Sequence, residues 1–330
     1  MTNTQRLGAL VATRAVGPMH LTRRTFVLSA PAVASATGVS AAAPPAWRTG
    51  RLAVPGGEVL WRMFGGGPGL PFIMVHGGPT RLGSKLLEYD YPLGDERRLI
   101  TWDQLDTGGS DKPRNPKNWR LARFVEELER VRQALAPGPV HVGGASTGSG
   151  IVMEWMITHR PRDVKSLVLM CPTLDMRVPV ARQAAQQRLS PASAAAFREF
   201  NRTGRSTPEV EAAQAEYRRI FIMRRPPPGI DLADNDMYDM EIIRALTPDL
   251  AGRDRAKPLR DLTQPVLFVR GEHDWVRDED VRAYAALCRD AEIATIPDAA
   301  HLAFIDNPTA YHAVVRRFFR KVEGRAGSAR

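Results

Sequence analysis

Short runs of apolar residues alternate with amphipathic stretches along most of this chain. Leu121–Leu135 repeats apolar residues at positions 121, 125, 128, 131 and 135, the spacing of a helix with one buried face. Apolar runs of strand length lie on either side, at 71–76, 98–102, 140–142 and 167–170, and a helical stretch at 151–158 separates the last two. This order predicts a mostly parallel sheet covered by helices on both faces. Ahead of it, strands at 51–53 and 59–64 flank Pro55-Gly56-Gly57 and predict an antiparallel hairpin.

The alternation stops between Pro172 and Asp261. This segment is rich in Ala, Arg and Gln, with helical patterns at 191–201 and 208–224 and a Pro226-Pro227-Pro228 breaker. We interpret it as a helical cap inserted at about 173–260. Strand–helix order then resumes with a strand at 265–270, a helix at 278–288, a strand at 292–296 and a helix at 308–322.

The N-terminal segment resembles a twin-arginine export signal. Thr22-Arg23-Arg24-Thr25-Phe26-Val27-Leu28 precedes an apolar stretch, and small residues at 40–43 offer a cleavage site. Residues 1–42 contain four arginines and no acid. We therefore expect residues 1–43 to be removed and the protein to be periplasmic or extracellular. No other segment approaches the roughly 18 consecutive apolar residues of a membrane span, so none is expected in the mature chain.

The net charge of the chain does not indicate a further function. The net charge of +10 falls to +6 without the four N-terminal arginines, and the remaining charges are interspersed, so we expect no nucleic-acid partner. The two cysteines, Cys171 and Cys288, could pair in an exported protein. A buried thiol is the commoner fate of a cysteine in an apolar run, and the sequence does not predict a disulfide.

The strongest chemical signal is Gly144-Ala145-Ser146-Thr147-Gly148, between an apolar strand and a helix. A serine on a tight strand-to-helix turn projects its hydroxyl above the sheet, and flanking glycines relieve crowding in that turn. The start of the following helix offers unpaired amides to a developing oxyanion. Ser146 is the candidate nucleophile.

A serine needs a base to take its proton and an acid to orient that base, in the order Ser, Asp or Glu, His in this architecture. Asp274 follows the strand at 265–270, and His301 follows the strand at 292–296. Glu272 and His273 are rival candidates beside Asp274. The ends of parallel strands meet at one edge of the sheet, so we predict Ser146, Asp274 and His301 as a catalytic triad.

A second oxyanion donor is expected in the loop after an earlier strand. His76-Gly77-Gly78-Pro79 follows the strand at 71–76, and its glycines let backbone amides turn inward. We predict the N–H groups of Gly78 and Thr147 as the oxyanion hole. His76 precedes the serine in the chain and is expected to brace this loop.

Together these motifs resemble the proline iminopeptidase family of α/β-hydrolases. The matching segments are His76-Gly77-Gly78-Pro79, Asp103-Gln104-Leu105-Asp106-Thr107-Gly108-Gly109-Ser110-Asp111-Lys112-Pro113, the Ser146 turn, Gly271–Asp274, Ala300-His301 and Asn307-Pro308. The resemblance implies an α/β-hydrolase fold with its core at 46–172 and 261–322 and a cap at 173–260. It also implies release of an N-terminal residue from a small molecule or short peptide, with no cofactor and no metal. Oligomeric state is left open.

An aminopeptidase also needs an acid to hold the substrate's ammonium. The resemblance implicates Glu211 and Glu241, although cap acids can equally be solvated partners of the many cap arginines. The turn at Ser146 differs from the family's usual Gly-Gly-Ser-aromatic-Gly at Ala145 and Thr147. An esterase, lactonase or amidase of small metabolites therefore stays open, as does a non-catalytic binding protein. Apolar residues at 221–223 and 237–240 could line a pocket or pack the cap.

Overall fold

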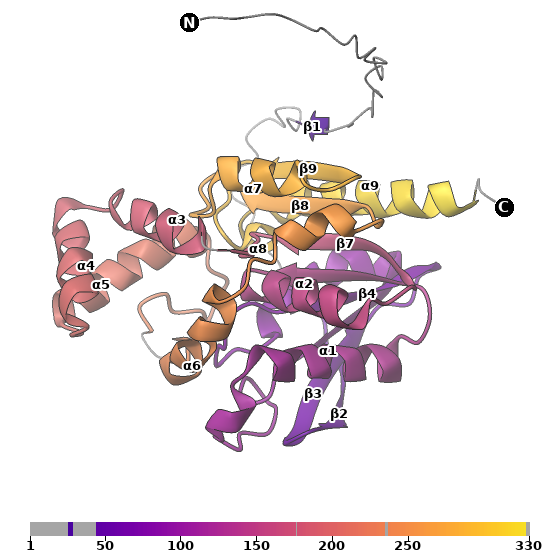
Figure 1. The fold of residues 1–330 in the computed structure, drawn as a ribbon, viewed down its shortest axis with the longest axis horizontal. Helices are drawn as coiled ribbons and strands as arrows, with labels where there is room; N and C mark the ends of the chain where they lie inside the picture. The colour runs from indigo at the N-terminus through magenta and orange to yellow at the C-terminus, as the bar shows by residue number, and fades with distance from the viewer. Residues whose placement is uncertain (1–25, 29–43, 176, 235–236, 328–330) are drawn as a thin grey trace, which may run out of the picture.

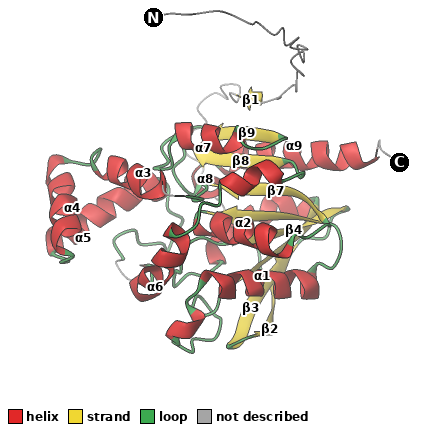
Figure 2. Cartoon of the chain, viewed as in Figure 1, coloured by secondary structure: helices red, strands yellow, loops and turns green. Residues whose placement is uncertain are grey.

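The computed structural model describes residues 26–28, 44–175, 177–234 and 237–327, and these form one large sheet flanked by helices (Figures 1 and 2). The strand order is β1-β9-β8-β7-β6-β4-β5-β3-β2. The strands are β1 Phe26–Leu28, β2 Arg48–Val54, β3 Gly57–Phe64, β4 Gly69–Val75, β5 Arg97–Trp102, β6 Val140–Ala145, β7 Val164–Met170, β8 Val266–Gly271 and β9 Ala291–Ile296. The mostly parallel sheet predicted from the apolar runs is confirmed.

The pairing follows the predicted pattern. β2 and β3 form the antiparallel hairpin, with Val54 opposite Gly57 across the turn, and β3 runs antiparallel to β5. From β5 to β9 every neighbouring pair is parallel. Every residue of β6 and β8 is buried, as expected for central strands with both faces covered.

The helices of the core connect these strands. They are α1 Leu121–Leu135, α2 Thr147–His159, α7 Asp278–Ala285, α8 Ala303–Asp306 and α9 Pro308–Gly327. The predicted helix at 121–135 has the observed bounds of α1, whereas α9 continues to Gly327, beyond its expected end at 322. The 3-10 segment η1, Lys85–Asp95, was not predicted, because its apolar residues follow no helical period and Pro92 interrupts it.

The segment between β7 and β8 forms a group of helices, which we call the cap segment. Its helices are α3 Arg177–Gln186, α4 Pro191–Thr203, α5 Pro208–Tyr217, the π-helical turn η3 Arg218–Ile222, α6 Met240–Ala251 and the 3-10 turn η5 Lys257–Asp261. Figure 1 shows α3, α4 and α5 projecting to one side of the sheet. Ser and Thr side chains cap two of these helices, since those of Ser190 and Thr207 accept hydrogen bonds from backbone amides in the first turns of α4 and α5.

The predicted export signal lies largely outside the described residues. Its three described residues, Phe26–Leu28, form β1 and pair in parallel with Glu292–Ala294 at the edge of the sheet. Within the part of the chain that the structure describes, no helix combines the length and apolar character that crossing a bilayer requires.

Glu323 fastens the end of α9 to the sheet. Its Oε1 accepts from the Arg97 guanidinium at 2.7 Å, the Leu70 amide at 3.0 Å and His141 Nε2 at 3.1 Å. Burial opposes the negative charge, but the bonds from His141 and Arg97 outweigh it and lower the pKa of Glu323 to about 2.

We expect Glu323→Gln to lower the free energy of unfolding by about 1.5–3 kcal/mol at pH 7, the range for hydrogen bonds to a charged group. Because the folded pKa is depressed, the stabilisation is present above the unfolded value and is lost as pH falls toward 2. The difference between wild type and variant, measured by urea unfolding at pH 7, 4 and 3, should therefore be full at pH 7 and shrink from pH 4 to pH 3. Glu126→Gln, which removes an exposed partner of Arg130, is the control, with an expected loss under about 1 kcal/mol. A pH-independent difference would contradict the role of the charge.

Candidate active site

Ser146 lies at the sharp turn between β6 and α2. Its backbone has φ 52° and ψ −122°, a conformation that a non-glycine residue rarely adopts. The Ser146 amide donates to the Met170 carbonyl at 2.9 Å, and the side chain remains partly exposed while all of β6 is buried. The turn thus presents the hydroxyl at the carboxyl end of the central strands, the geometry of a nucleophile elbow.

Glycines allow this turn to pack against the His76-Gly77-Gly78-Pro79 loop. A Cβ on Gly148 would meet the carbonyl oxygens of Val75 and, at 2.7 Å, His76. A Cβ on Gly77 would lie 2.7 Å from the Ala145 carbonyl oxygen and 2.9 Å from Ser146 Cβ. The two loops are therefore in direct contact, and both contacts are with backbone or the short serine side chain.

We expect Gly148→Ala to force β4 and α2 apart and to destabilise the protein by about 1–3 kcal/mol, the range for overpacking. The shift would also displace the Thr147 amide, so kcat should fall at least about 10-fold by the loss of oxyanion stabilisation. Thermal unfolding and turnover are the measurements. Gly138→Ala is the control for activity, since a Cβ there meets nothing within 4 Å, although φ +109° makes some loss of stability expected there too. Unchanged kcat in Gly148→Ala would contradict the assigned contact.

His301 and Asp274 form a buried hydrogen-bonded pair. His301 Nδ1 lies 2.8 Å from Asp274 Oδ1, which also accepts from the Val276 amide at 3.0 Å. A neutral imidazole that donates from Nδ1 leaves Nε2 as an acceptor. Asp274 therefore holds the tautomer that a general base requires. The rival residues Glu272 and His273 face each other at 4.0 Å and are largely exposed.

Cys171 connects this pair to Ser146. One ligand atom from each of Cys171, Asp274 and His301 lies within 4.8 Å of the others, and all three residues are buried. A hydrogen bond from the Ser146 backbone also lowers the pKa of the Cys171 thiol, against the larger effect of burial. Asp274 and His301 thus lie beside one buried sulfur atom, that of Cys171. A cysteine, an aspartate and a histidine could also hold a metal ion. The Asp274–His301 hydrogen bond uses Nδ1 and Oδ1 and leaves Nε2 and Oδ2.

Asp274 stabilises a positive charge at His301. Burial opposes that charge, whereas the Asp274 carboxylate and its hydrogen bond raise the pKa of His301, and a thiolate at Cys171 would raise it further. Burial raises the pKa of Cys171 as well, so that residue is a neutral thiol near neutral pH. Asp274 is then the charge that stabilises an imidazolium at His301.

His76 braces the loop that carries Gly78, as expected. Its Nδ1 donates to the Gly77 carbonyl at 2.8 Å, and its Nε2 accepts from the Gln104 amide at 3.1 Å. Gln104 Nε2 donates in turn to the His76 carbonyl at 3.1 Å. Burial lowers the pKa of His76, which keeps it neutral and compatible with this pattern. The Gly78 backbone, with φ +24°, is therefore held from both sides of the loop.

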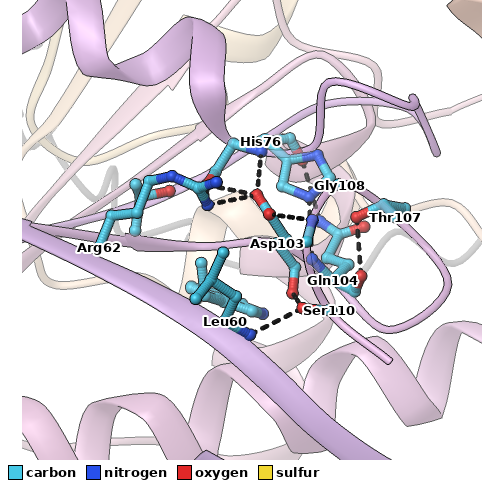
Figure 3. A network of polar contacts seen from close by, with 12 residues as sticks. Leu60, Arg62, His76, Asp103, Gln104, Thr107, Gly108 and Ser110 are labelled. Carbon is cyan, nitrogen blue, oxygen red and sulfur yellow. Dashed lines mark hydrogen bonds and ion pairs between the residues drawn. The ribbon is translucent and has the colours of Figure 1, made fainter. Parts of the chain in front are cut away.

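Asp103 is the centre of the network beneath this loop (Figure 3). Its fully buried carboxylate accepts from the Arg62 guanidinium at 2.7 Å, the Ser84 amide at 2.7 Å and the Gly109 amide at 2.6 Å. Burial alone would raise the pKa of Asp103, but Arg62 and the amides lower it below its ordinary value. One buried charge thus links β3, the residue before η1 and the loop after β5.

Ser149 joins the elbow to the start of the cap segment. Its hydroxyl donates to the Ser146 carbonyl at 2.5 Å and accepts from the Thr173 amide at 2.9 Å. This link gives Ser149 a structural role near the nucleophile.

Glu211 and Glu241 are not brought to the triad. Glu211 is exposed on α5, and Glu241 is exposed on α6, where it pairs with Arg114 at 2.5 Å. The acid candidates and the Ser146–His301–Asp274 cluster therefore occupy different places. Cys171 and Cys288 are both free thiols, the first buried and the second partly buried.

Aromatic residues next to the triad were not predicted as site residues. The Trp275 ring stacks on His301 with centroids 5.1 Å apart and an interplanar angle of 24°. Tyr238 lies 3.5 Å from where a Cβ on Gly78 would stand. Trp275 directly follows Asp274, so its place in the chain was a usable signal. Tyr238 is more than 150 residues from Gly78 and carried no such signal.

The cap segment also contacts the catalytic loop through its backbone. The amides of His301 and Leu302 donate to the carbonyls of Phe221 and Ile222 at 3.1 and 2.9 Å. Phe221, Ile222 and Met223 are buried. The apolar stretch at 221–223 therefore packs the cap segment directly against the loop that carries His301.

Comparison with known proteins agrees with this geometry. A family model of the alpha/beta hydrolase fold matches residues 71–308, which together with the sheet and the elbow defines the chain as an α/β-hydrolase. The proline iminopeptidase of Heyndrickxia coagulans is 31% identical over 294 residues, covering 83% of this chain and 99% of that protein. The proline iminopeptidase of Levilactobacillus brevis is 26% identical, covering 74% of this chain and 87% of that protein. The chain belongs to the proline iminopeptidase family of α/β-hydrolases and is a hydrolase.

Solved structures show the same fold. A proline iminopeptidase from Mycobacterium smegmatis superposes with a TM-score of 0.73 at 23% identity, covering 84% of this chain and all of that one. An esterase from Thermogutta terrifontis superposes with a TM-score of 0.58 at 22% identity, covering 83% and 99%. These two proteins differ in the bonds that their names imply, so the shared fold does not decide the substrate.

Proposed function

We propose that this enzyme cleaves an amide or ester by acyl transfer to Ser146. The observation that carries the proposal is the buried His301–Asp274 pair, at 2.8 Å, beside the strained turn that presents Ser146. His301 Nε2 takes the hydroxyl proton as the serine oxygen bonds to the substrate carbonyl carbon, and the resulting imidazolium is stabilised by Asp274. The histidine then protonates the leaving group. Water, deprotonated by the same nitrogen, releases the acyl group and restores the serine.

The negative charge that forms on the carbonyl oxygen needs two donors. We assign these to the amides of Gly78 and Thr147, on the two loops that touch at Gly77 and Ser146. Thr147 is the first residue of α2, where amides lack helical partners. Each donor is expected to lower the barrier by about 3–4 kcal/mol.

Two substrate classes compete for this site. Kinship with proline iminopeptidases supports an aminopeptidase that releases an N-terminal residue. The positions of Glu211 and Glu241, one exposed and one paired with Arg114, favour instead an esterase, lactonase or amidase that needs no free amine.

Matched chromogenic substrates separate the two classes. Prolyl, alanyl and N-acetyl-alanyl p-nitroanilides, assayed beside p-nitrophenyl acyl esters, test the requirement for an amine. Turnover of the free-amine anilides alone would support the aminopeptidase. Ester turnover without any amine requirement would exclude it. A chain that hydrolyses neither class and takes up no fluorophosphonate label would refute acyl transfer to Ser146.

We further propose that residues 1–43 direct export through the twin-arginine route. The proposal is supported by the Arg23-Arg24 pair, the following apolar stretch and the small residues at 40–43. In a bacterial host with that route, a shortened protein should accumulate outside the cytoplasm. The double substitution Arg23→Lys and Arg24→Lys should retain the full-length chain inside, whereas Arg6→Lys with Arg14→Lys should not. Equal export of both double variants would refute the proposal.

A further inference from the structure

The part of the cap segment next to the triad carries positive charge. The guanidinium carbon of Arg182, on α3, lies 5.1 Å from the centre of the Trp275 ring. Trp275 is buried and also stacks on His301 at 5.1 Å, so one aromatic ring contacts both Arg182 and His301. Within the described residues, no carboxylate pairs with Arg182, and its side chain is exposed.

Beside it is a buried hydroxyl. The Tyr217 hydroxyl has no partner of good hydrogen-bond geometry among the described residues, although a buried hydroxyl normally has one. The Tyr217 ring packs on Phe221 at 5.3 Å, and the Phe221 carbonyl accepts from the His301 amide. Burial raises the pKa of Tyr217 well above its usual range. The charge and hydrogen bonding of Arg182 oppose that rise and the charge of Asp274 adds to it, which indicates that Tyr217 lies between these two groups.

Tyr238 extends the same environment to the oxyanion loop. It packs over Gly78, and burial raises the pKa of its hydroxyl against the opposing charges of Arg182 and Arg218. Two acids of the cap segment form hydrogen bonds or ion pairs with other groups. Glu216 accepts from Ser190 and Ser193, and Asp239 pairs with Arg114. The cap charges that act on the Tyr217 and Tyr238 hydroxyls are thus the guanidinium groups of Arg182 and Arg218.

We propose that Arg182 and the Tyr217 hydroxyl bind a carboxylate of the substrate, so that the enzyme prefers anionic esters or amides over those with a cationic end. The inference rests on the proposed acyl transfer to Ser146. A guanidinium offers several N–H donors in a plane that suits a carboxylate, and a phenol adds one more. A substrate ammonium at this place would meet like charge.

Three p-nitrophenyl esters with six-carbon acyl chains test the charge preference on the full-length protein. They are the hexanoate, the monoester of adipic acid and the 6-(trimethylammonio)hexanoate, with the Ser146→Ala rate subtracted as background. We expect kcat/KM for the adipate monoester to exceed that for the trimethylammonio ester at least about 10-fold, the effect of one hydrogen bond to a charged group.

Variants test whether Arg182 and Tyr217 cause the preference for an anionic ester. Arg182→Gln should raise KM for the adipate monoester about 10-fold and leave the hexanoate within about two-fold, and Arg182→Lys should keep part of the preference. Tyr217→Phe should also act on the adipate monoester alone. Arg205→Gln, in the loop between α4 and α5, removes another exposed cap arginine and should change none of the three rates.

The outcomes distinguish the proposed carboxylate site from the acyl transfer to Ser146 on which it rests. Serine-dependent hydrolysis of the hexanoate without a charge preference, or an equal effect of Arg182→Gln on all three esters, would overturn the carboxylate site and leave acyl transfer intact. Failure of the full-length protein to hydrolyse any of the three esters would overturn the carboxylate site, and it would overturn acyl transfer as well if Ser146 takes up no fluorophosphonate label.

Discussion

Replacing Ser146 with alanine is expected to lower kcat on the order of 10⁶-fold on any substrate that the enzyme hydrolyses, the loss measured for removal of a triad nucleophile. The reason is that His301 then has no hydroxyl nucleophile at the elbow to deprotonate. KM should change little, because the substrate contacts outside the hydroxyl remain. The measurement is turnover together with fluorophosphonate labelling, which should be lost completely.

A variant at a second triad residue should lose less kcat than Ser146→Ala. Asp274→Asn keeps the size of the side chain but favours the wrong imidazole tautomer, so kcat should fall on the order of 10⁴-fold. Ser193→Ala, which removes a cap hydroxyl that donates to Glu216, is the matched control and should retain wild-type turnover. Residual activity above about 1% in Ser146→Ala would exclude this serine as the nucleophile.

The sequence predicted most of the fold because its central signals are local. The apolar period of Leu121–Leu135 predicted helix α1 with its observed bounds, and mostly apolar runs predicted the strands β4, β6, β7 and β8. A strand covered on both faces is rich in apolar residues, so its burial is visible in the sequence. The weakly patterned η1 was missed for the same reason, since 3-10 turns bury residues without a 3.6-residue period.

The candidate site was predictable only where chemistry required a chain order. Ser146, Asp274 and His301 each follow a strand, and parallel strands bring their ends to one edge. Cys171 also follows a strand, β7, and could have been added by that rule. Arg182 and Tyr238 could not, because their positions depend on how helices of the cap segment pack, and a single exposed arginine or a tyrosine in a loop has no distinctive pattern.

Glu211 and Glu241 show the same limit of predicting cap residues from sequence. Glu211 and Glu241 were chosen by family resemblance and by place in the chain, but a helix presents residues to all sides. Glu241 lies in the first turn of α6, where its charge suits the helix dipole and Arg114 is within reach. An acid in a cap segment with many arginines finds such partners readily, which makes sequence position a weak guide to an ammonium site.

Asp103→Asn is expected to lower the free energy of unfolding by about 3–5 kcal/mol, the range for leaving one member of a buried ion pair uncompensated. The amide would keep the shape of Asp103 but leave the Arg62 guanidinium, only 12% exposed, against a neutral group. It would also turn an N–H₂ toward one of the donors from Ser84 and Gly109 that the carboxylate now accepts. Urea unfolding at pH 7 measures the loss. Asp111→Asn, at an exposed position of the same loop, should cost under about 1 kcal/mol.

Acidity and turnover distinguish a charge effect from a packing effect at Asp103. Its folded pKa is depressed, so its stabilisation is present above the unfolded value of 3.8 and is lost as pH falls through the folded value. Wild type and Asp103→Asn should therefore converge in stability below pH 3.8 and remain separate at pH 7. Since Gln104, the next residue, holds the loop of Gly78 through His76, kcat should fall along with stability, more than in Asp111→Asn. A variant that loses stability equally at all pH values would show that Asp103 acts by packing, and one with unchanged kcat would show that its network does not reach the oxyanion loop.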